Sequence, residues 1–211
     1  MYKVCLKRCF DILLSICCLP LLGLVFLFVA PLIYLEDKGP AFYNGERIGQ
    51  KGRIFKMHKF RSMKVNAPDI RLPDGSTYNG EDDPRVTKIG RFLRETSLDE
   101  LPQILNILKG EMSLIGPRPD PPDWIDKYPE DLRVFLEAKP GITGYSQAYF
   151  RNSDDSYEKI AHDAYYAQNI TFGFDVKIFF KTIATVLKHE NIYREAPAAS
   201  EEEEEKVTAE K

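Results

Sequence analysis

The sequence of 211 residues lacks cysteine after residue 18, and its three histidines have no metal-ligand spacing. We therefore expect neither a disulfide framework nor a zinc site, and the four cysteines favour a reducing compartment. The chain also lacks the basic excess of nucleic-acid-binding proteins, because 29 lysines and arginines stand against 32 acidic residues. It has no internal repeat, and its length favours one folded core.

Charge is unevenly distributed along the chain. The net charge of -3 comes from the C-terminal end, where six glutamates and two lysines give residues 198–211 a charge of -4. Such a composition is typical of a solvated segment. We therefore predict that residues 196–211 are a disordered acidic tail.

A long apolar segment lies near the N-terminus. Residues 12–35 carry no charge, and as a helix they would be about 36 Å long, enough to cross a hydrocarbon core of roughly 30 Å. A secretory signal peptide has a shorter apolar region followed by a small-residue cleavage site, and neither is present. The segment is therefore predicted to enter the membrane as a helix.

Two features favour a re-entrant helix over one that spans the bilayer. Pro20, with Gly23 close behind, interrupts the segment, and prolines at such positions kink helices. Basic residues flank both sides of the segment, beginning with Lys7 and Arg8, so both ends prefer the cytoplasm. We predict that residues 1–36 dip into one leaflet, break near Pro20 and return. Lys7, Arg8 and Pro20 would then lie at the lipid interface.

Residues 37–195 are predicted to form the catalytic domain. Short apolar runs predict brief strands, and apolar residues at helical spacing predict amphipathic helices. The last of these, Asp175–Lys188, could lie on a membrane surface or pack in the core. The fold class expected is α+β and mostly helical, with a re-entrant membrane helix packed on a small cytoplasmic catalytic domain. The expected elements are strands at 41–43 and 54–57, a loop at 66–84, and helices at 88–95, about 98–109, 129–138, 157–169 and 175–188.

The adjacent carboxylates Asp99 and Glu100 open one of these helices. Ser97 and Glu100 fit a capping box, while Pro102 suits a helix start one or two residues further on. The helix spacing puts Asp99, Gln103 and Asn106 opposite the apolar stripe, toward solvent or a ligand. A helix start favours phosphate, and acids beside a phosphate hold a metal or attack phosphorus. An ordinary capped surface helix is the alternative. The apolar stripe consists of Leu101, Ile104, Leu105 and Leu108.

Basic side chains occur in two further motifs. Arg118 stands between two prolines, whose rigid backbone suits a guanidinium aimed at phosphate or carboxylate. Lys59 and Arg61 alternate with apolar residues as on a strand, and so share one face. For each of them a solvated surface role remains open.

These motifs, in this order, resemble the bacterial sugar transferases, the monotopic phosphoglycosyl transferases that start glycoconjugate assembly on a polyprenol phosphate. The resemblance covers roughly residues 3 to 190. The motifs that carry it are Lys7-Arg8 with Asp11, Gly39-Pro40 through Tyr43 to Glu46-Arg47-Ile48-Gly49, Lys59 to Met63, Arg94 with Ser97 to Gln103, Gly110 to Ser113, Gly116 to Pro119, Pro140 to Gly144 with Gln147, Arg151-Asn152, and Asp163 with Tyr165-Tyr166.

The resemblance implies a mechanism. Asp99 would be the nucleophile that attacks the β-phosphate of a UDP-sugar, releasing UMP and forming a phosphosugar-aspartate intermediate. Glu100 would help to deprotonate the incoming polyprenol phosphate, and Mg²⁺ would associate with Asp99. The residues expected to bind phosphate or substrate are Lys59, Arg61, Arg94, Arg118, Gln147 and Arg151.

The implied partners are a UDP-sugar donor, undecaprenyl phosphate, an anionic bilayer surface and downstream glycosyltransferases, with no nucleic acid. The implied location is the cytoplasmic face of the bacterial inner membrane, at the first membrane step of glycoconjugate assembly. A non-catalytic membrane-anchored scaffold that binds polyprenol phosphate is the alternative function. A one-span phosphotransferase or hydrolase without a lipid acceptor is a further one. The stretch Tyr145–Phe150 departs from the family pattern, so no sugar preference is transferred.

Overall fold

A computed structural model describes residues 2–72, 77–150 and 156–188. The described chain is mostly helical with two small two-stranded sheets, which confirms the predicted balance of elements. The acidic tail lies outside the described residues. The elements are the short helices η1 (Tyr2–Leu6), η2 (Gln50–Gly52), η3 (Leu98–Gln103), η4 (Pro122–Trp124) and η5 (Glu130–Glu137), the helices α1 (Lys7–Asp37), α2 (Lys88–Glu95), α3 (Ile104–Lys109), α4 (Tyr145–Tyr149), α5 (Ser156–Gln168) and α6 (Phe172–Leu187), and the strands β1 (Phe42–Ile48), β2 (Ile54–Phe60), β3 (Ser113–Ile115) and β4 (Gly141–Thr143).

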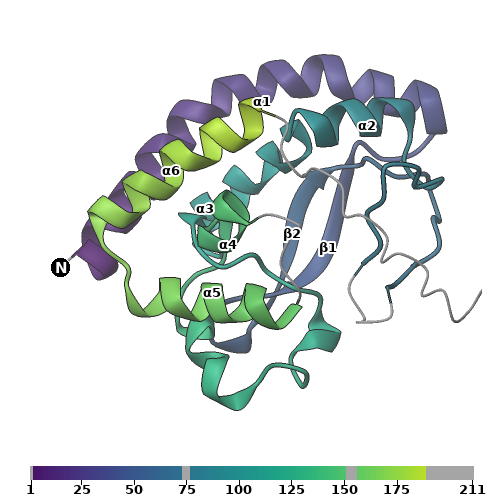
Figure 1. Cartoon of the computed structure of the whole chain (residues 1–211). Coiled ribbons are helices and arrows are strands. Elements are labelled where there is room, and N and C mark those ends of the chain that lie inside the picture. The colour runs from purple at the N-terminus through teal and green to yellow at the C-terminus, as the bar shows by residue number, and fades with distance from the viewer. Residues whose placement is uncertain (1, 73–76, 151–155, 189–211) are drawn as a thin grey trace, which may run out of the picture.

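Helix α1 is a single helix of 31 residues that arches over one side of the molecule (Figure 1). Pro20 and Pro31 both lie inside it. The predicted break near Pro20 is therefore wrong. A proline removes one backbone hydrogen bond, and here the helix bends without ending. By length and composition α1 is, among the described helices, the one long and apolar enough to cross a membrane.

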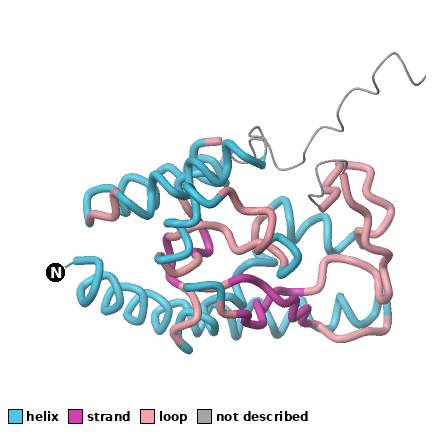
Figure 2. The backbone as a smooth tube through the Cα atoms, turned by 90° about the horizontal axis from the view of Figure 1, so that it is seen from below, coloured by secondary structure: helices cyan, strands magenta, loops and turns pink. Residues whose placement is uncertain are grey.

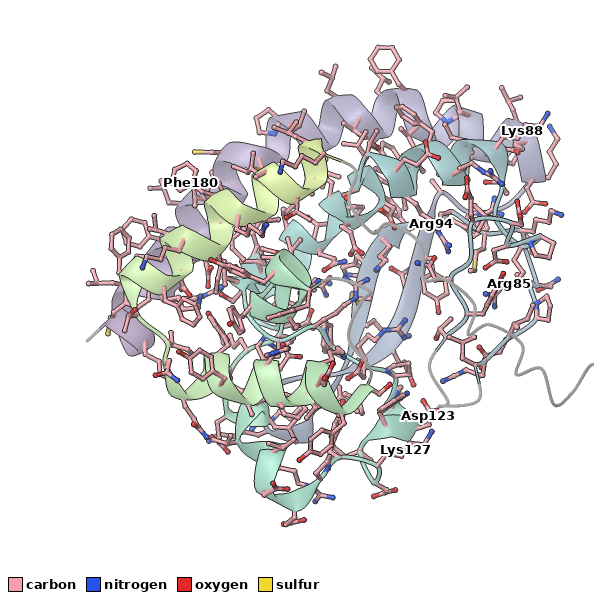
Figure 3. The ribbon with its side chains drawn as sticks, viewed as in Figure 1. Arg85, Lys88, Arg94, Asp123, Lys127 and Phe180 are labelled. Carbon is pink, nitrogen blue, oxygen red and sulfur yellow. The ribbon has the colours of Figure 1, made fainter. Side chains whose placement is uncertain are left out.

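The outer surfaces of α1 and α6 are apolar, and the two helices meet at their N-terminal ends, where the Phe10 and Phe172 rings stack with their centroids 5.6 Å apart. Only Asp175, Ile178 and Thr185 of α6 are buried, so most of its apolar face points outward, as Phe180 does in Figure 3. This favours the membrane-surface alternative for α6 over core packing. The exposed apolar side chains of this surface include Leu13, Leu24, Leu27, Phe28, Leu35, Phe172, Phe179, Phe180, Ile183 and Leu187.

Basic residues at the N-terminal end of α1 form an ion pair and hydrogen bonds with α6 and α3. The Lys7 ammonium pairs with the Asp175 carboxylate at 2.6 Å, and Arg8 donates to the carbonyls of Ile107 and Leu108 at 2.5 and 3.2 Å. The prediction that Lys7 and Arg8 lie at the lipid interface stays a prediction, and in the structure both side chains engage protein groups. Arg8 satisfies carbonyl groups at the C-terminus of α3 that have no partner within the helix. Pro20, in contrast, is exposed.

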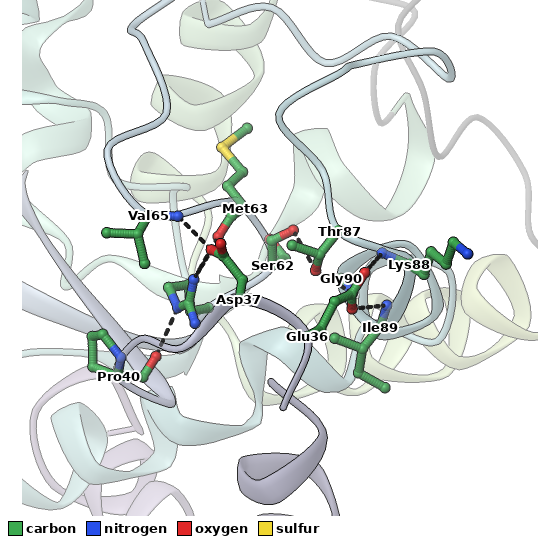
Figure 4. A network of polar contacts seen from close by, with 11 residues as sticks. Glu36, Asp37, Pro40, Ser62, Met63, Val65, Thr87, Lys88, Ile89 and Gly90 are labelled. Atoms are coloured by element: carbon green, nitrogen blue, oxygen red, sulfur yellow. Dashed lines mark hydrogen bonds and ion pairs between the residues drawn. The ribbon is translucent and has the colours of Figure 1, made fainter. Parts of the chain in front are cut away.

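Acidic residues at the C-terminal end of α1 accept hydrogen bonds from other parts of the chain (Figure 4). The Glu36 carboxylate accepts from the backbone N–H groups of Lys88 and Ile89 at the start of α2, at 2.7 and 3.0 Å. The Asp37 carboxylate accepts from Arg61 at 2.5 Å and from the backbone of Val65 at 2.6 Å. Arg61, predicted to bind substrate, is thus buried beneath α1 and away from the cavity described below. The structure does not bring Arg61 to that cavity, because Asp37 and nearby carbonyl groups engage the guanidinium. Its role in substrate binding stays a prediction.

The hairpin of β1 and β2 packs one face against α1 and turns its other face toward the cavity described below. Its antiparallel register pairs Phe42 with Phe60 and Tyr43 with Lys59. Phe42 and Phe60 stack on each other and on Phe26 of α1, so this face of the hairpin packs against the helix. Because side chains alternate across a strand, Lys59 lies on the opposite face. Seen from below, the long loop after β2 projects on the side away from the N-terminus (Figure 2).

Strands β3 and β4 are parallel, and Gly116 follows β3 at a close backbone approach. A Cβ atom there would lie 2.2 Å from the Lys139 carbonyl oxygen and 2.8 Å from the Gly141 nitrogen. Backbone atoms cannot rotate away, so we expect Gly116→Ala to lower the melting temperature by roughly 5–10 °C. Gly173→Ala is the control, because nothing lies within 4 Å of its Cβ position. Equal melting temperatures in differential scanning fluorimetry would contradict this prediction.

Candidate active site

A cavity of about 500 Å³ lies between the hairpin, the loop after β2, η3, the loop after β3 and α6. Its walls combine cations, carboxylates and apolar side chains. Residues far apart in the sequence meet there, since β2 and α6 are more than a hundred residues apart. The charged lining residues are Arg47, Lys59, Arg94, Asp99, Glu100, Arg118 and Lys159.

The turn before η3 directs the two acidic side chains. Ser97 adopts a left-handed conformation with φ of 57° and makes no side-chain cap hydrogen bond, so the predicted capping box is wrong. The predicted α-helix begins later, at Ile104, and residues 98–103 form the tighter η3. Gln103 and Asn106, expected to face solvent or a ligand, are fully buried. Asn106 instead connects α3 to β2 by accepting from the His58 N–H and donating to the Lys56 carbonyl.

Glu100 is the centre of a charged cluster. Its carboxylate accepts from Lys59 at 2.6 Å, from Arg118 at 2.9 Å and from the Gln103 amide. Burial alone would raise the pKa of Glu100, but Lys59 and Arg118 outweigh burial and lower the pKa to about 2. Glu100 is therefore ionised at neutral pH and holds both cations in place.

Asp99 has a different environment, although it is the adjacent residue. Its side chain borders the cavity at 8% exposure. Within the described residues its carboxylate accepts no hydrogen bond and forms no ion pair. Burial and the neighbouring Glu100 charge raise the pKa of Asp99 to about 6, while Lys59, Arg94 and Arg118 oppose that rise. A desolvated carboxylate without hydrogen bonds is a strong candidate nucleophile.

The cavity brings together most of the predicted substrate-binding residues. Arg94 donates to Ser62 Oγ and Asn79 Oδ1, both at 3.0 Å, and points from α2 toward the centre of the molecule (Figure 3). Gln147 lines the cavity and donates to the Ile142 carbonyl at 3.2 Å. Lys59, Arg94, Arg118 and Gln147 thus share the cavity with Asp99 and Glu100. Arg151 lies outside the described residues.

The lining residues that were not predicted as site residues include Trp124, Lys159 and Arg47. Trp124 and Lys159 come from η4 and α5, and no local pattern marks them. Lys159 pairs with Asp120 at 2.6 Å. Arg47 could have been predicted from the sequence, because it follows Tyr43 at an even spacing along the strand. This spacing puts its side chain on the hairpin face that carries Lys59.

The site fits a magnesium ion only in part. Among the described residues, no three His, Cys, Asp or Glu side chains converge on a possible metal position. Glu100 is already bonded to Lys59 and Arg118, which leaves Asp99 as the available carboxylate of the pair. Because Mg²⁺ often binds through one or two carboxylates and the phosphates of a substrate, these residues fit an ion that arrives with a phosphate ligand.

Comparisons with known proteins show the family of the chain. Residues 2–189 match the family described as Bacterial sugar transferase. The undecaprenyl-phosphate galactose phosphotransferase of Salmonella typhimurium is 40% identical over 205 residues, covering 89% of this chain and 42% of that protein. The UDP-N-acetylgalactosamine-undecaprenyl-phosphate N-acetylgalactosaminephosphotransferase of Aeromonas hydrophila is 39% identical over 188 residues, covering 86% of this chain and 44% of that protein.

A shorter relative is covered almost fully. The exopolysaccharide production protein ExoY of Sinorhizobium fredii is 41% identical over 191 residues, which cover 85% of this chain and 84% of that protein. The chain therefore spans less than half of the two longer relatives and most of the shorter one.

Proposed function

Because the chain belongs to the bacterial sugar transferase family, we propose that it transfers a sugar-1-phosphate from a UDP-sugar to undecaprenyl phosphate and releases UMP. The observation that carries this proposal is Asp99, a carboxylate that faces a cavity lined by Lys59, Arg94 and Arg118. The names of the two longer relatives, which act with undecaprenyl phosphate, support the acceptor.

In the first half-reaction an Asp99 oxygen attacks the β-phosphorus of the donor. An O–P bond forms, the P–O bond to the α-phosphate breaks, and UMP leaves with the electron pair. Lys59, Arg94 and Arg118 offset the repulsion between the carboxylate and the diphosphate. Mg²⁺ held by Asp99 and the donor phosphates would add further charge neutralisation.

In the second half-reaction a phosphate oxygen of the lipid attacks the same phosphorus, and the bond to Asp99 breaks. The carboxylate is regenerated, and the sugar leaves as a lipid-linked diphosphate. The family resemblance gives Glu100 the role of base in this step. With a pKa of about 2 it is a weak proton acceptor, so we infer that it acts chiefly by positioning Lys59 and Arg118.

We propose that α1 enters the cytoplasmic face of the bacterial inner membrane as a re-entrant helix. A helix of 31 residues is about 46 Å long, and one that spanned the bilayer would place its ends on opposite sides. The ends of α1 are instead bonded to the same body, through Lys7 at one end and Glu36 at the other. The apolar surface of α1 and α6 would face the acyl chains.

The test of the proposed function is UMP release from a panel of UDP-sugars, with magnesium, with and without undecaprenyl phosphate. Sustained release that requires the lipid and occurs with one donor would support the transferase and identify its sugar. Sustained release without lipid would indicate a hydrolase. Absence of release from every donor would contradict the proposal and favour the membrane-anchored scaffold.

The pH dependence of the reaction provides a separate prediction. The Asp99 carboxylate must be ionised to attack, and its pKa is raised to about 6. We therefore expect kcat/KM to rise with pH through a midpoint near 6 and to fall about tenfold per pH unit below it. An acid limb centred near pH 4, the range of an unperturbed aspartate, would contradict this assignment.

A further inference from the structure

Arg47 is a cavity cation that the proposed reaction has not yet used. Its guanidinium donates to the Glu46 carbonyl at 2.7 Å and forms no ion pair with any described residue. Three other cavity cations form ion pairs, since Lys59 and Arg118 share Glu100 and Lys159 pairs with Asp120. The carboxylate that acts on Arg47 is that of Asp120, which is itself paired with Lys159 at 2.6 Å. A guanidinium with no ion pair of its own, in the wall of a cavity, favours an anionic ligand.

The hairpin holds Arg47 toward the cavity. The Tyr43 side chain lies within hydrogen-bonding reach of the guanidinium, and it reaches there by folding across Gly45. A Cβ atom at Gly45 would lie 2.7 Å from the Tyr43 ring, so the glycine leaves room for this contact. Burial lowers the pKa of Arg47, and the nearby charge of Arg118 lowers it further. The guanidinium nonetheless stays charged, because an arginine side chain is not deprotonated in proteins.

Lys59, Arg118 and Arg47 form a row of cations, here called the basic row. Tyr43 is the register partner of Lys59, and Arg47 lies four residues further along β1, about 13 Å at the backbone. Arg118 interacts electrostatically with both ends of the row. The basic row therefore leads from the Asp99–Glu100 pair outward along the hairpin face.

A nucleotide sugar has two adjacent anionic phosphates to place along this row. The phosphorus that Asp99 attacks must lie at the Lys59 end. The other phosphate belongs to the leaving nucleotide, and the next cation outward that forms no ion pair with a described residue is Arg47. We propose that Arg47 binds the phosphate of the leaving nucleoside monophosphate. This inference rests on the proposed function and adds a residue to it.

The experiment measures the affinity of the full chain in detergent for UMP and for uridine, each with magnesium, by isothermal titration calorimetry. Uridine has the same base and ribose but no phosphate. We expect Arg47→Gln to weaken UMP binding tenfold or more and to leave uridine binding unchanged, because only the phosphate contact is lost. Arg47→Lys should restore part of the UMP affinity. Arg53→Gln, an exposed arginine near the turn of the same hairpin, is the matched control.

Two results would overturn the inference alone. One is equal UMP affinity in Arg47→Gln and the unsubstituted protein. The other is an equal loss for UMP and uridine, which would place Arg47 on the base or ribose. A failure of the proposed function is recognised separately, because the unsubstituted protein would then neither bind UMP nor release it from any donor. That result would overturn both proposals.

Discussion

Asp99→Asn is expected to abolish turnover, with UMP release falling about a thousandfold or more, while the protein stays folded. The amide has nearly the shape of the carboxylate but cannot form the covalent bond to phosphorus. Asp99 accepts no hydrogen bond from any described residue, so the substitution removes no native contact there. The measurement is lipid-dependent UMP release, with intact-protein mass spectrometry to detect the phosphosugar adduct.

The same substitution should raise stability. The pKa of Asp99 is raised to about 6, so above that pH the folded state holds an ionised group that it disfavours, at a cost of roughly 2–3 kcal/mol. The cost is absent below the ordinary aspartate pKa and grows as pH rises toward 6. Removing the charge should raise the melting temperature at neutral pH by roughly 5 °C.

Two further variants complete this experiment. Asp99→Ala should lose the same activity, which excludes recovery of the carboxylate by deamidation of the asparagine. Asp126→Asn, at an exposed position, should change neither activity nor melting temperature. Full turnover in well-folded Asp99→Asn would remove Asp99 as the nucleophile.

Sequence patterns predicted correctly the elements that are stabilised mainly by interactions between residues close together in the sequence. The helix at 88–95 was predicted with the bounds of α2, because its apolar spacing and the Thr87 cap, which accepts from the Gly90 N–H, both act within one turn. The strands were predicted too short. Gly45 and the polar residues of the hairpin weaken the sequence pattern, and the strands are extended by pairing with each other.

Several predicted site residues line one cavity, but the sequence did not predict the contacts that they make there. The capping box failed because Glu100 interacts with Lys59 and Arg118, which lie 41 and 18 residues away. A charge-assisted contact with two cations outweighs one local cap. Sequence spacing alone cannot indicate which distant cations will meet a carboxylate.

The basic residues of the N-terminal region show the same limit. Lys7 forms an ion pair with Asp175, which lies 168 residues away in the sequence, and Arg61 forms one with Asp37. In the sequence both cations are typical of a membrane or phosphate interface. The tertiary fold determines which cations form internal contacts and which remain available for a ligand.

Glu100→Gln is expected to reduce both activity and stability. The carboxylate is the shared partner of Lys59 and Arg118, and replacing it leaves two cations without their counter-charge. Breaking such a pair costs ~3 kcal/mol in a buried setting, and less for Arg118, whose side chain is 39% exposed. We expect a melting temperature lower by several degrees. Glu81→Gln, on the exposed loop, is the control.

The half-reactions distinguish positioning from base catalysis. If Glu100 were only the base for the lipid phosphate, Glu100→Gln would still release one equivalent of UMP rapidly and stall afterwards. If it positions Lys59 and Arg118, the first release itself should slow, because the cations that offset the diphosphate charge are displaced. A rapid-quench measurement of the first turnover separates the two roles.

The pH profile gives a readout that a merely structural role would not change. The charge of Glu100 raises the pKa of Asp99, so its removal should lower that pKa and move the acid limb of kcat/KM below pH 6. An unmoved acid limb together with an intact first turnover would show that Glu100 neither sets the charge state of the nucleophile nor positions its cations.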